Sequence, residues 1–535
     1  MTHDTTPAKV TPAQLHSALR GPDEIAVLDV REARHYAQAQ IALSSHQSLS
    51  FLDSVARRVL PRTGVPIVLV DDEGGPRALA AAETLRELGY TDVRILQGGV
   101  QAWQAAGYAT GTGYNTVVKA FADLAHAHYA TPTITPAALQ ERLGASRPTT
   151  VVDCRPEPEY RRLSIAGAYN APGVELALHD FDAHPDADHL WVISCFSRTR
   201  GIVGTTTLAR LAGRGKVAFL EDGIMAAVLQ GVPTGPGSRG AVPAPLIDSD
   251  AAARLAREIA KRHRLSVIDL PQYAALKAQR DERSLYVFDV RHESRYAEGH
   301  LPDAISAPGG QLVMTHDLQV PVRRARVVLV DDGDLLRATI TAFWLSQFGD
   351  AEVHVLSAPP SSFTSTTAVL DVPPGVAWID AQELAASLAR GEVRLFDVGA
   401  SLQYEQGHIP GAEFILRSDW AAWFHAARPE GPLVFTSPDG ANAAFAARDA
   451  GRLTDAPVLA LQGGTAAWRA AGLPIDTGGV PERQRSEFED DWGSPMRVST
   501  DLDAPFREYL AWERALGHAI ASDDTVAFRW SDAVA

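Results

Sequence analysis

The chain has 535 residues, of which 46% are hydrophobic and 21% charged, and its net charge at pH 7 is −16. This balance is ordinary for globular proteins, and the length predicts three to four domains. The acidic charge disfavours nucleic acid and anionic membrane surfaces as partners. We expect no membrane span, because no apolar run approaches the roughly 18–20 residues that one needs, and we expect no secretory signal.

The chain has only two cysteines, Cys154 and Cys195. This number excludes a disulfide scaffold and a zinc site built from three or four thiolates. Sparse cysteine without a signal segment predicts a reducing cytoplasm. The histidines are scattered, and His126 and His128 are spaced so that one helix face cannot present both. No glycine-rich phosphate loop is found, so we expect neither a metal nor a cofactor.

A short apolar strand that ends in Asp and runs into a polar turn occurs four times, about a domain length apart. The copies lie at residues 27–31, 151–155, 287–291 and 395–399. A second apolar strand, rich in β-branched residues, follows each copy, at residues 66–70, 190–194, 326–330 and 432–436. Such continuous runs are typical of strands buried on both faces.

Each second strand leads through a tight loop into a helix, such as the alanine-rich segments 78–88 and 441–450. Alternating strands and helices with short connections predict an α/β fold. In this fold, repeated doubly wound domains each have a parallel sheet with helices on both faces. The breaks rich in Pro, Gly and Ser at 235–245 and 358–375 separate units.

Two connecting helices are expected, at residues 116–129 and 250–262. The tail from residue 480 is acidic at first and then predicts a helix over 505–520. Four apolar residues lie near one face of this helix, namely Phe506, Leu510, Leu516 and Ile520. We expect this face to dock against the fourth unit, and binding of another protein is the less favoured alternative.

Further motifs follow the strands. Residues 293–304 read ESRYAEGHLPDA, 401–412 read SLQYEQGHIPGA, and 157–168 read EPEYRRLSIAGA. A Gly-Gly pair followed by Trp103 or Trp468 closes the first and last units. Together with the Asp-x-Arg motifs, these features resemble the rhodanese family over roughly residues 9–477. The resemblance implies rhodanese-like domains at 9–112, 132–236, 263–358 and 376–477, followed by a tail at 478–535 that carries the docking helix.

In the rhodanese fold the chemistry belongs to the loop after the central strand. Backbone N–H groups curl there into a concavity, and the next helix points its positive end at the same place. A thiol in this position is driven towards thiolate and accepts sulfane sulfur as a persulfide. Residues 195–201, CFSRTRG, resemble the family's active loop, in which Cys and Arg are separated by four residues and a small residue follows.

The corresponding loops of the other units are aligned at residues 72–78, 332–338 and 437–443. This alignment puts Asp72, Asp332 and Ser437 at the position of the nucleophile. An Asp cannot carry sulfane sulfur, and a Ser without a neighbouring base is not expected to do so. The first, third and fourth domains are therefore predicted to be inactive. In tandem rhodaneses such silent domains commonly cover the cleft of an active neighbour.

Cys195 is the predicted nucleophile. Arg198 and Arg200 are expected to lower its pKa and to attract a small dianion such as thiosulfate. The predicted substrate-binding loop also contains Phe196, Ser197, Thr199 and Gly201. Asp153 and Arg155 match the family's Asp-x-Arg and are expected to support the loop as an ion pair, together with Glu159. Ser164 replaces the family's His.

Cys154 occupies the position of Val30, Val290 and Val398 and is expected to be structural. The resemblance thus implies a thiosulfate sulfurtransferase that passes sulfur from a small-molecule donor to a thiol or to cyanide. Transfer from 3-mercaptopyruvate or glutathione persulfide stays open. A non-enzymatic array that acts as a scaffold or sulfur-carrier adaptor is the main alternative. A phosphatase or arsenate reductase is disfavoured, because those loops are one residue longer.

Overall fold

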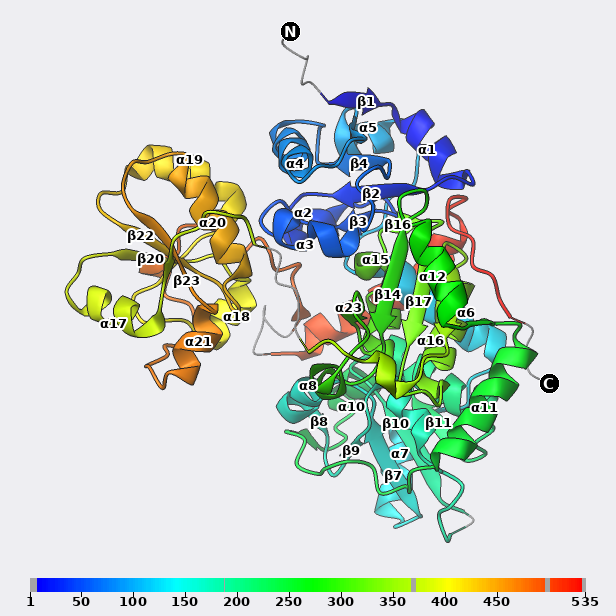
Figure 1. Ribbon diagram of the computed structural model, residues 1–535. Helices are drawn as coiled ribbons and strands as arrows, with labels where there is room; N and C mark the ends of the chain where they lie inside the picture. The colour runs from blue at the N-terminus through cyan, green and yellow to red at the C-terminus, as the bar shows by residue number, and fades with distance from the viewer. Residues whose placement is uncertain (1–6, 187, 367–371, 496–500, 532–535) are drawn as a thin grey trace. The chain divides into compact units, whose positions relative to one another are not determined.

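The computed structural model describes residues 7–186, 188–366, 372–495 and 501–531, and they divide into two compact units. The first unit takes the described residues of 1–15, 27–114 and 368–494, and the second takes those of 16–26, 115–367 and 495–535. The first unit thus holds most of the first repeat and the fourth, and the second unit holds the second and third repeats (Figure 1).

The first repeat builds a sheet in the order β1-β5-β4-β2, with β3 paired to β2. Its strands are β1 (Ala8–Val10), β2 (Ile25–Asp29), β3 (Ser45–His46), β4 (Ile67–Val70) and β5 (Val93–Leu96). Its helices are α1 (Pro12–Arg20), α2 (Ala33–Gln38), α3 (Leu52–Val59), α4 (Pro76–Glu87) and α5 (Gly99–Ala105). The N-cap of α5 is Gly98 at φ 71°, a left-handed conformation that suits glycine.

The fourth repeat has the sheet order β19-β23-β22-β20-β21, and all of these pairs are parallel. Its strands are β19 (Trp378–Ile379), β20 (Arg394–Asp397), β21 (Glu413–Phe414), β22 (Leu433–Thr436) and β23 (Val458–Leu461). Its helices are α17 (Ala381–Ala389), α18 (Ser401–Gln406), α19 (Arg417–Ala427), α20 (Ala441–Gly451), α21 (Gly464–Ala470) and the short η4 (Pro481–Arg483).

The second repeat has the parallel order β6-β11-β10-β7-β9 and a separate antiparallel pair, β8 with β12. Its strands are β6 (Thr133–Ile134), β7 (Thr149–Asp153), β8 (Ser164–Ile165), β9 (Tyr169–Asn170), β10 (Leu190–Ser194), β11 (Val217–Leu220) and β12 (Thr234–Gly235). Its helices are α7 (Pro136–Gly144), α8 (Glu157–Arg162), η1 (Gly173–Leu178), α9 (Thr199–Thr206), the π-helical continuation η2 (Thr207–Leu211) and α10 (Gly223–Leu229).

The third repeat has the parallel order β13-β18-β17-β14-β15. Its strands are β13 (Ser266–Ile268), β14 (Leu285–Asp289), β15 (Ile305–Ser306), β17 (Arg326–Val330) and β18 (Glu352–Leu356). The short strand β16 (Val322–Arg323) is outside this sheet and pairs antiparallel with Ile25 and Ala26 of β2. The helices of this repeat are α12 (Leu270–Ala278), α13 (Glu293–Glu298), α14 (Gly309–Met314), α15 (His316–Gln319), α16 (Leu336–Gln347) and η3 (Pro360–Ser362). The repeated parallel sheets with their helices confirm the predicted α/β class.

Both faces of the second sheet are buried, which explains the continuous apolar strands. Val151 and Val192 pack on one face into a cluster with Tyr160. Trp191 and Ile193 point to the opposite face and pack into a second cluster, which also contains both cysteines. Since neighbours along a strand alternate between the faces, every residue of β10 after Leu190 is buried.

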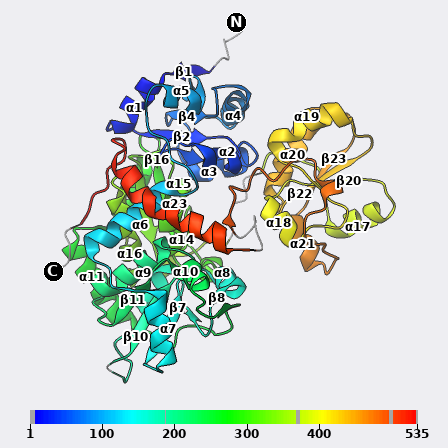
Figure 2. The same ribbon diagram turned by 180° about the vertical axis from the view of Figure 1, so that it is seen from behind.

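Two connecting helices lie where the sequence predicts them, α6 (Thr116–Tyr129) and α11 (Ser249–Arg262). The helix near the C-terminus, α23 (Asp503–Ala521), also forms, and its four predicted apolar residues are buried. The expectation that it docks against the fourth repeat is wrong. It packs against α6 and α10, where Phe506 and Leu510 contact Met225 and Ala226, because these helices provide an apolar face within the second unit (Figure 2).

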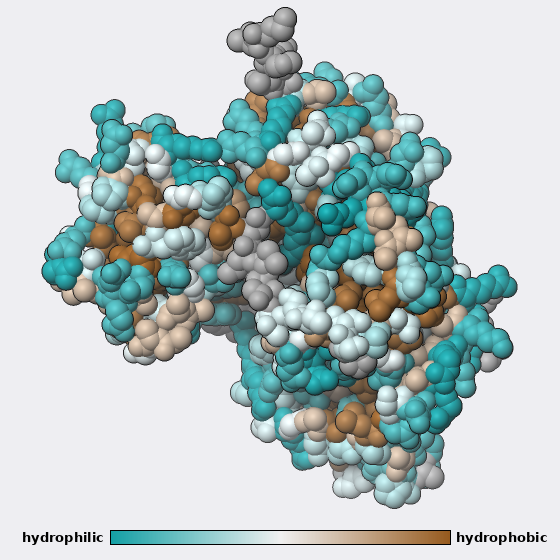
Figure 3. Space-filling model, in the orientation of Figure 1, coloured by the Kyte–Doolittle hydropathy of each residue, from teal (hydrophilic) through white to brown (hydrophobic). Residues whose placement is uncertain are grey.

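Hydrophilic residues cover most of the molecular face that Figure 3 shows. The large apolar side chains that are exposed in the described residues come from separate parts of the chain: Leu79, Leu143, Leu246, Val267, Trp378 and Leu402. None of the helices in the described ranges combines the length and the hydropathy that a membrane span requires.

Candidate active site around Cys195

Cys195 follows directly after β10, and Cys154 follows directly after the neighbouring strand β7. The two strands run parallel with Asp153 opposite Ser194, and the Cys154 N–H donates to the Ser194 carbonyl over 2.9 Å. The two thiols therefore come from adjacent strand ends and share one buried cluster. The carboxyl end of a parallel sheet is where ligand sites form in open α/β folds.

The loop from Cys195 to α9 requires two glycines. A Cβ atom on Gly201 would lie 3.3 Å from the Cys195 Sγ and 2.6 Å from the ring of Phe219. A Cβ atom on Gly223 would lie 2.4 Å from the Cys195 carbonyl oxygen. The absence of side chains at these positions lets the first turn of α9 and the turn after β11 close around the thiol.

Cys195 is only 2% exposed. Besides this burial, four groups change the pKa of its thiol. Burial raises the pKa of its thiol. The Cys154 thiol, which hydrogen-bonds to it, the positive charge of Arg200 and the Gly201 N–H all lower that pKa. The carboxylate of Glu513 raises it, but the result is a pKa below the ordinary value. The site therefore favours the thiolate, the reactive form of cysteine.

The structure separates the two predicted arginines. Arg200 acts on Cys195 and binds Glu159 through two hydrogen bonds of 2.6 and 2.7 Å. Arg198 instead contacts Asp222 at 2.7 Å and Asp123 of α6. The guanidinium of Arg198 is thus engaged by two carboxylates outside the loop.

Two further loop residues, Phe196 and Ser197, contact α23. The Phe196 ring packs edge-on against Phe506, with ring centroids 5.7 Å apart. The Ser197 hydroxyl donates to Glu513 Oε1 over 3.1 Å. Thr199 is buried, and its hydroxyl has no hydrogen-bond partner within the described residues. This hydroxyl lies at the N-terminus of α9, which begins at Thr199.

Glu513 is a site residue that the sequence analysis missed. It is 1% exposed, and its Oε1 also accepts from Lys119 of α6 over 3.2 Å. Its Oε2 has no hydrogen-bond partner within the described residues. A signal was present, because Glu513 lies three residues from both Leu510 and Leu516 on the apolar face of the predicted helix. A lone carboxylate on a buried face needs a polar partner.

Asp153 and Arg155 form a buried ion pair of 2.7 Å behind the loop. Ser164 donates its hydroxyl to the same carboxylate over 2.8 Å. The Arg155 guanidinium also lies 5.8 Å from the ring centroid of Phe196. These contacts connect the end of β7 with the start of the active loop.

The backbone register corrects the alignment of the loops by one residue. The hydrogen bond from Cys154 to Ser194 has counterparts from Val30 to Val70, from Val290 to Val330 and from Val398 to Thr436. The residues equivalent to Cys195 are therefore Asp71, Asp331 and Ser437. Asp72 and Asp332 stand one position later and accept instead from Arg31 and Arg291. The fourth loop is aligned as expected.

A carboxylate occupies the amide concavity of the first and third loops. Asp71 accepts from four backbone N–H groups, those of Glu73, Gly74, Gly75 and Ala78. Asp331 accepts from Gly333, Leu335 and Ala338. The last donor lies seven residues after the Asp, whereas Gly201 lies six after Cys195, so these two loops are one residue longer. Burial raises the pKa of Asp331 to about 6.

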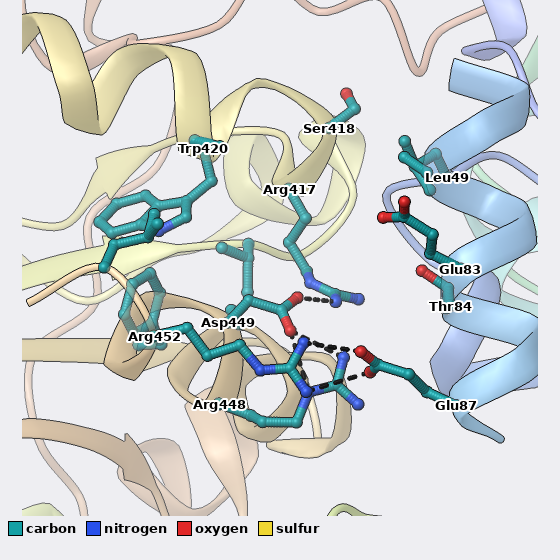
Figure 4. Close-up of a pocket in the computed structure, with 16 residues that line it drawn as sticks. Leu49, Glu83, Thr84, Glu87, Arg417, Ser418, Trp420, Arg448, Asp449 and Arg452 are labelled. Carbon is teal, nitrogen blue, oxygen red and sulfur yellow. Dashed lines mark hydrogen bonds and ion pairs between the residues drawn. The ribbon is translucent and has the colours of Figure 1, made fainter. Parts of the chain in front are cut away.

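The first unit contains a cavity of about 420 Å³ lined by α4 of the first repeat and by α19 and α20 of the fourth (Figure 4). Three arginines line it, and each has an acidic partner: Arg417 and Arg448 bind Asp53 and Asp449, and Arg452 binds Glu87. Both cysteines of the chain lie in the second repeat, so this cavity offers no thiol.

A family model for the rhodanese-like domain matches residues 11–106, 135–229, 272–358 and 380–471. The chain belongs to the rhodanese family. The crystal structure of thiosulfate sulfurtransferase from Pseudomonas aeruginosa is 34% identical, covers 98% of this chain and 99% of its own, and superposes with a TM-score of 0.88. These two findings support a sulfurtransferase-type enzyme.

Shorter stretches match two other solved structures. A protein of unknown function and possible tyrosine phosphatase from Rhodopseudomonas palustris is 26% identical over 19% of this chain and 85% of its own, with a TM-score of 0.18. The Alr3790 protein from Anabaena sp. is 25% identical over 19% of this chain and 96% of its own, also with a TM-score of 0.18. No match was found among curated proteins.

Proposed function

We propose that the protein is a thiosulfate sulfurtransferase that carries sulfane sulfur on Cys195. The observation that carries the proposal is the position of this thiol. It stands at the end of β10, with the Gly201 N–H and the charge of Arg200 both lowering its pKa. A thiolate stabilised in this way is the nucleophile that sulfur transfer needs. The other three repeats, which have Asp or Ser at this position, are non-catalytic in this proposal.

The reaction has two half-reactions. The Cys195 thiolate attacks the outer sulfur of thiosulfate, the sulfur–sulfur bond of the donor breaks, and sulfite leaves with the bonding electrons. The outer sulfur now forms a persulfide on Cys195. A thiolate or cyanide then attacks this outer sulfur, and Cys195 leaves as the thiolate. The groups that lower the pKa of Cys195 take the place of an external base, because they stabilise the thiolate directly.

The loop supplies the groups that would bind the donor. Arg200 provides positive charge, and the free hydroxyl of Thr199 provides a donor beside the N-terminus of α9. The similarity to the thiosulfate sulfurtransferase of Pseudomonas aeruginosa over nearly the whole chain supports the same donor.

Glu513 favours a second donor class. Its buried carboxylate acts on Cys195 and opposes the approach of a dianion. A persulfide such as glutathione persulfide presents less negative charge at its reacting sulfur and is therefore the alternative donor. Either donor requires free thiols, which both cysteines are, and a reducing compartment such as the cytoplasm keeps them so.

The test compares Cys195→Ser with Ser437→Ala, which changes the equivalent position of the fourth loop. Thiosulfate:cyanide transfer is measured for both variants and for the unmodified protein. We expect Cys195→Ser to lose on the order of 10³-fold or more of the activity, because the nucleophile is removed, and Ser437→Ala to retain it. Mass spectrometry after incubation with thiosulfate alone should find a gain of about 32 Da on the Cys195 peptide.

Full activity in Cys195→Ser would eliminate the enzyme mechanism. A non-enzymatic scaffold or sulfur-carrier adaptor predicts no transfer in any variant and no gain in mass. The same measurements with glutathione persulfide in place of thiosulfate rank the two donors by kcat/KM.

A further inference from the structure

The two cysteines of the chain are neighbours in space as well as in topology. Adjacent strands of a sheet lie about 4.8 Å apart, and a disulfide needs its two Cα atoms about 4.4–6.8 Å apart. Asp153 pairs with Ser194, so Cys154 and Cys195 are the next residues along the two strands. The hydrogen bond between their thiols raises the pKa of Cys154 and lowers that of Cys195. The strand pairing therefore brings the two residues near the separation that a disulfide needs.

The pair is confined to the repeat that has the nucleophile. The position of Cys154 is filled by Val30, Val290 and Val398 in the other three repeats, and each of these valines is buried. A valine therefore satisfies the packing at this point of the fold. Cys154 and Cys195 are 1% and 2% exposed and share one buried cluster, so each thiol has the other as its neighbouring sulfur.

We propose that Cys154 discharges the Cys195 persulfide as hydrosulfide when no external acceptor is present. This proposal rests on the proposed persulfide function. The Cys154 Sγ attacks the Sγ of Cys195, and a disulfide between the two cysteines forms. The bond from Cys195 to the outer sulfur breaks, and this sulfur leaves with the bonding electrons and takes the proton of Cys154.

The step balances in atoms and electrons. A persulfide anion and a thiol give a disulfide and one hydrosulfide ion. The sulfane sulfur is reduced to sulfide, and the two cysteines are oxidised together by two electrons. A dithiol reductant from solution then returns the disulfide to two thiols by exchange. With such a reductant the enzyme releases sulfide from a sulfane donor without an external sulfur acceptor.

The pKa of Cys154 determines which reaction of the persulfide is faster, discharge by Cys154 or transfer to an external acceptor. The hydrogen bond with Cys195 and burial raise the pKa of the Cys154 thiol well above its ordinary value. Cys154 is therefore protonated at neutral pH, and its attack is slower than attack by an ionised external acceptor. Discharge by Cys154 becomes faster as the pH rises.

The experiment is a single turnover without acceptor or oxygen. The reduced protein is mixed with one equivalent of thiosulfate, sulfide is measured, and intact and peptide masses are followed in time. We expect the gain of about 32 Da on Cys195 to decay into a loss of about 2 Da that joins the peptides of Cys154 and Cys195. About one sulfide per chain should be released. A sample without thiosulfate should form no disulfide.

The matched variant is Cys154→Val, which introduces the residue of the other three repeats. We expect its Cys195 persulfide to form and to persist, with at least tenfold less sulfide. A persulfide that persists equally in the unmodified protein, with neither disulfide nor sulfide, overturns this inference and leaves the proposed function intact. A disulfide that forms equally fast without thiosulfate also overturns it. Absence of any persulfide on Cys195 defeats the proposed function itself.

If the Cys154→Val variant forms no persulfide, the inference is tested with the unmodified protein alone. The joined peptides together with one sulfide per chain then support the inference, and any other products contradict it.

Discussion

The loops after β4 and β10 begin at the same register position, but the first is one residue longer and begins with an Asp where the second begins with a Cys. In the first repeat the Asp71 carboxylate accepts four amide hydrogen bonds from its own loop. In the second repeat the thiol of Cys195 stands at the same register position and has the Gly201 N–H as a backbone donor. A carboxylate of the chain thus accepts the amide hydrogen bonds of the first loop. The comparison teaches how a change of one side chain supports the proposed silence of the first loop, because an Asp carboxylate stands where the second loop has its thiol.

The largest effect is expected from Arg200→Met. Removal of this positive charge raises the pKa of Cys195, because Arg200 is one of the groups that lower it. The thiolate fraction at neutral pH falls as this pKa rises, and we expect the transfer rate to fall with it by about 10- to 100-fold. The rate should recover as the pH rises. Arg77→Met, at the equivalent position of the first loop, is the control and should leave the rate and its pH profile unchanged.

Asp71→Ala tests whether the carboxylate of the first loop stabilises the fold by accepting the hydrogen bonds of the loop amides. Four amide groups lose their acceptor, and we expect a loss of about 2 kcal/mol in the stability of the first unit. Calorimetry of the full chain measures this as a lower transition temperature. Sulfur transfer by Cys195 should be unaffected. An unchanged transition would mean that water replaces the carboxylate without cost.

Asp331→Asn tests the raised pKa of Asp331 in the third loop by measuring stability as a function of pH. Burial raises the pKa of Asp331 to about 6, from about 3.8 in an unfolded chain. The folded state thus binds a proton more tightly than the unfolded state, so this group's contribution is complete below about pH 4 and is lost as the pH rises through 6. We expect the stability difference between the unmodified protein and the variant to change by about 2–3 kcal/mol between pH 4 and 7. A constant difference would contradict the raised pKa.

Glu513→Gln should have the smallest effect. Its carboxylate raises the pKa of Cys195, so the variant should have a lower pKa and react faster with iodoacetamide near pH 6, by about two- to fivefold. Glu508→Gln, an exposed position on the same helix, is the control. Slower alkylation in Glu513→Gln would show that its contacts with Lys119 and Ser197 matter more for the loop than its charge.

The repeats, the α/β class and the two connecting helices could be predicted because each depends on local patterns. A strand that ends in Asp, a turn and an amphipathic helix can each be recognised from the residues of one segment. The sequence does not show that Asp71, and not Asp72, is equivalent to Cys195. The two Asp residues are consecutive, and because the loop is one residue longer, Arg77 keeps the expected spacing from Asp72. Only the hydrogen bond from Val30 to Val70 fixes the register.

The parts of the site that come from distant segments could not be predicted. Glu513 contacts Ser197 only because α23 packs on α6 and α10. The apolar face of a helix predicts burial but does not show which helices it will pack against. Cys154 looked like a valine substitute when its own motif was considered alone. Its significance depends on the pairing of β7 with β10, which places it beside Cys195.

The path of the chain through the two units has a consequence for synthesis on the ribosome. Protein domains tend to fold as they emerge, from the N-terminus onwards. The unit with Cys195 also contains α23, whose Glu513 binds the active loop, so its last piece is made after the whole fourth repeat. During translation Cys195 emerges long before α23, the helix that packs against its loop. The nascent protein therefore passes through a period in which Cys195 is more open to oxidants and electrophiles than it is in the finished molecule.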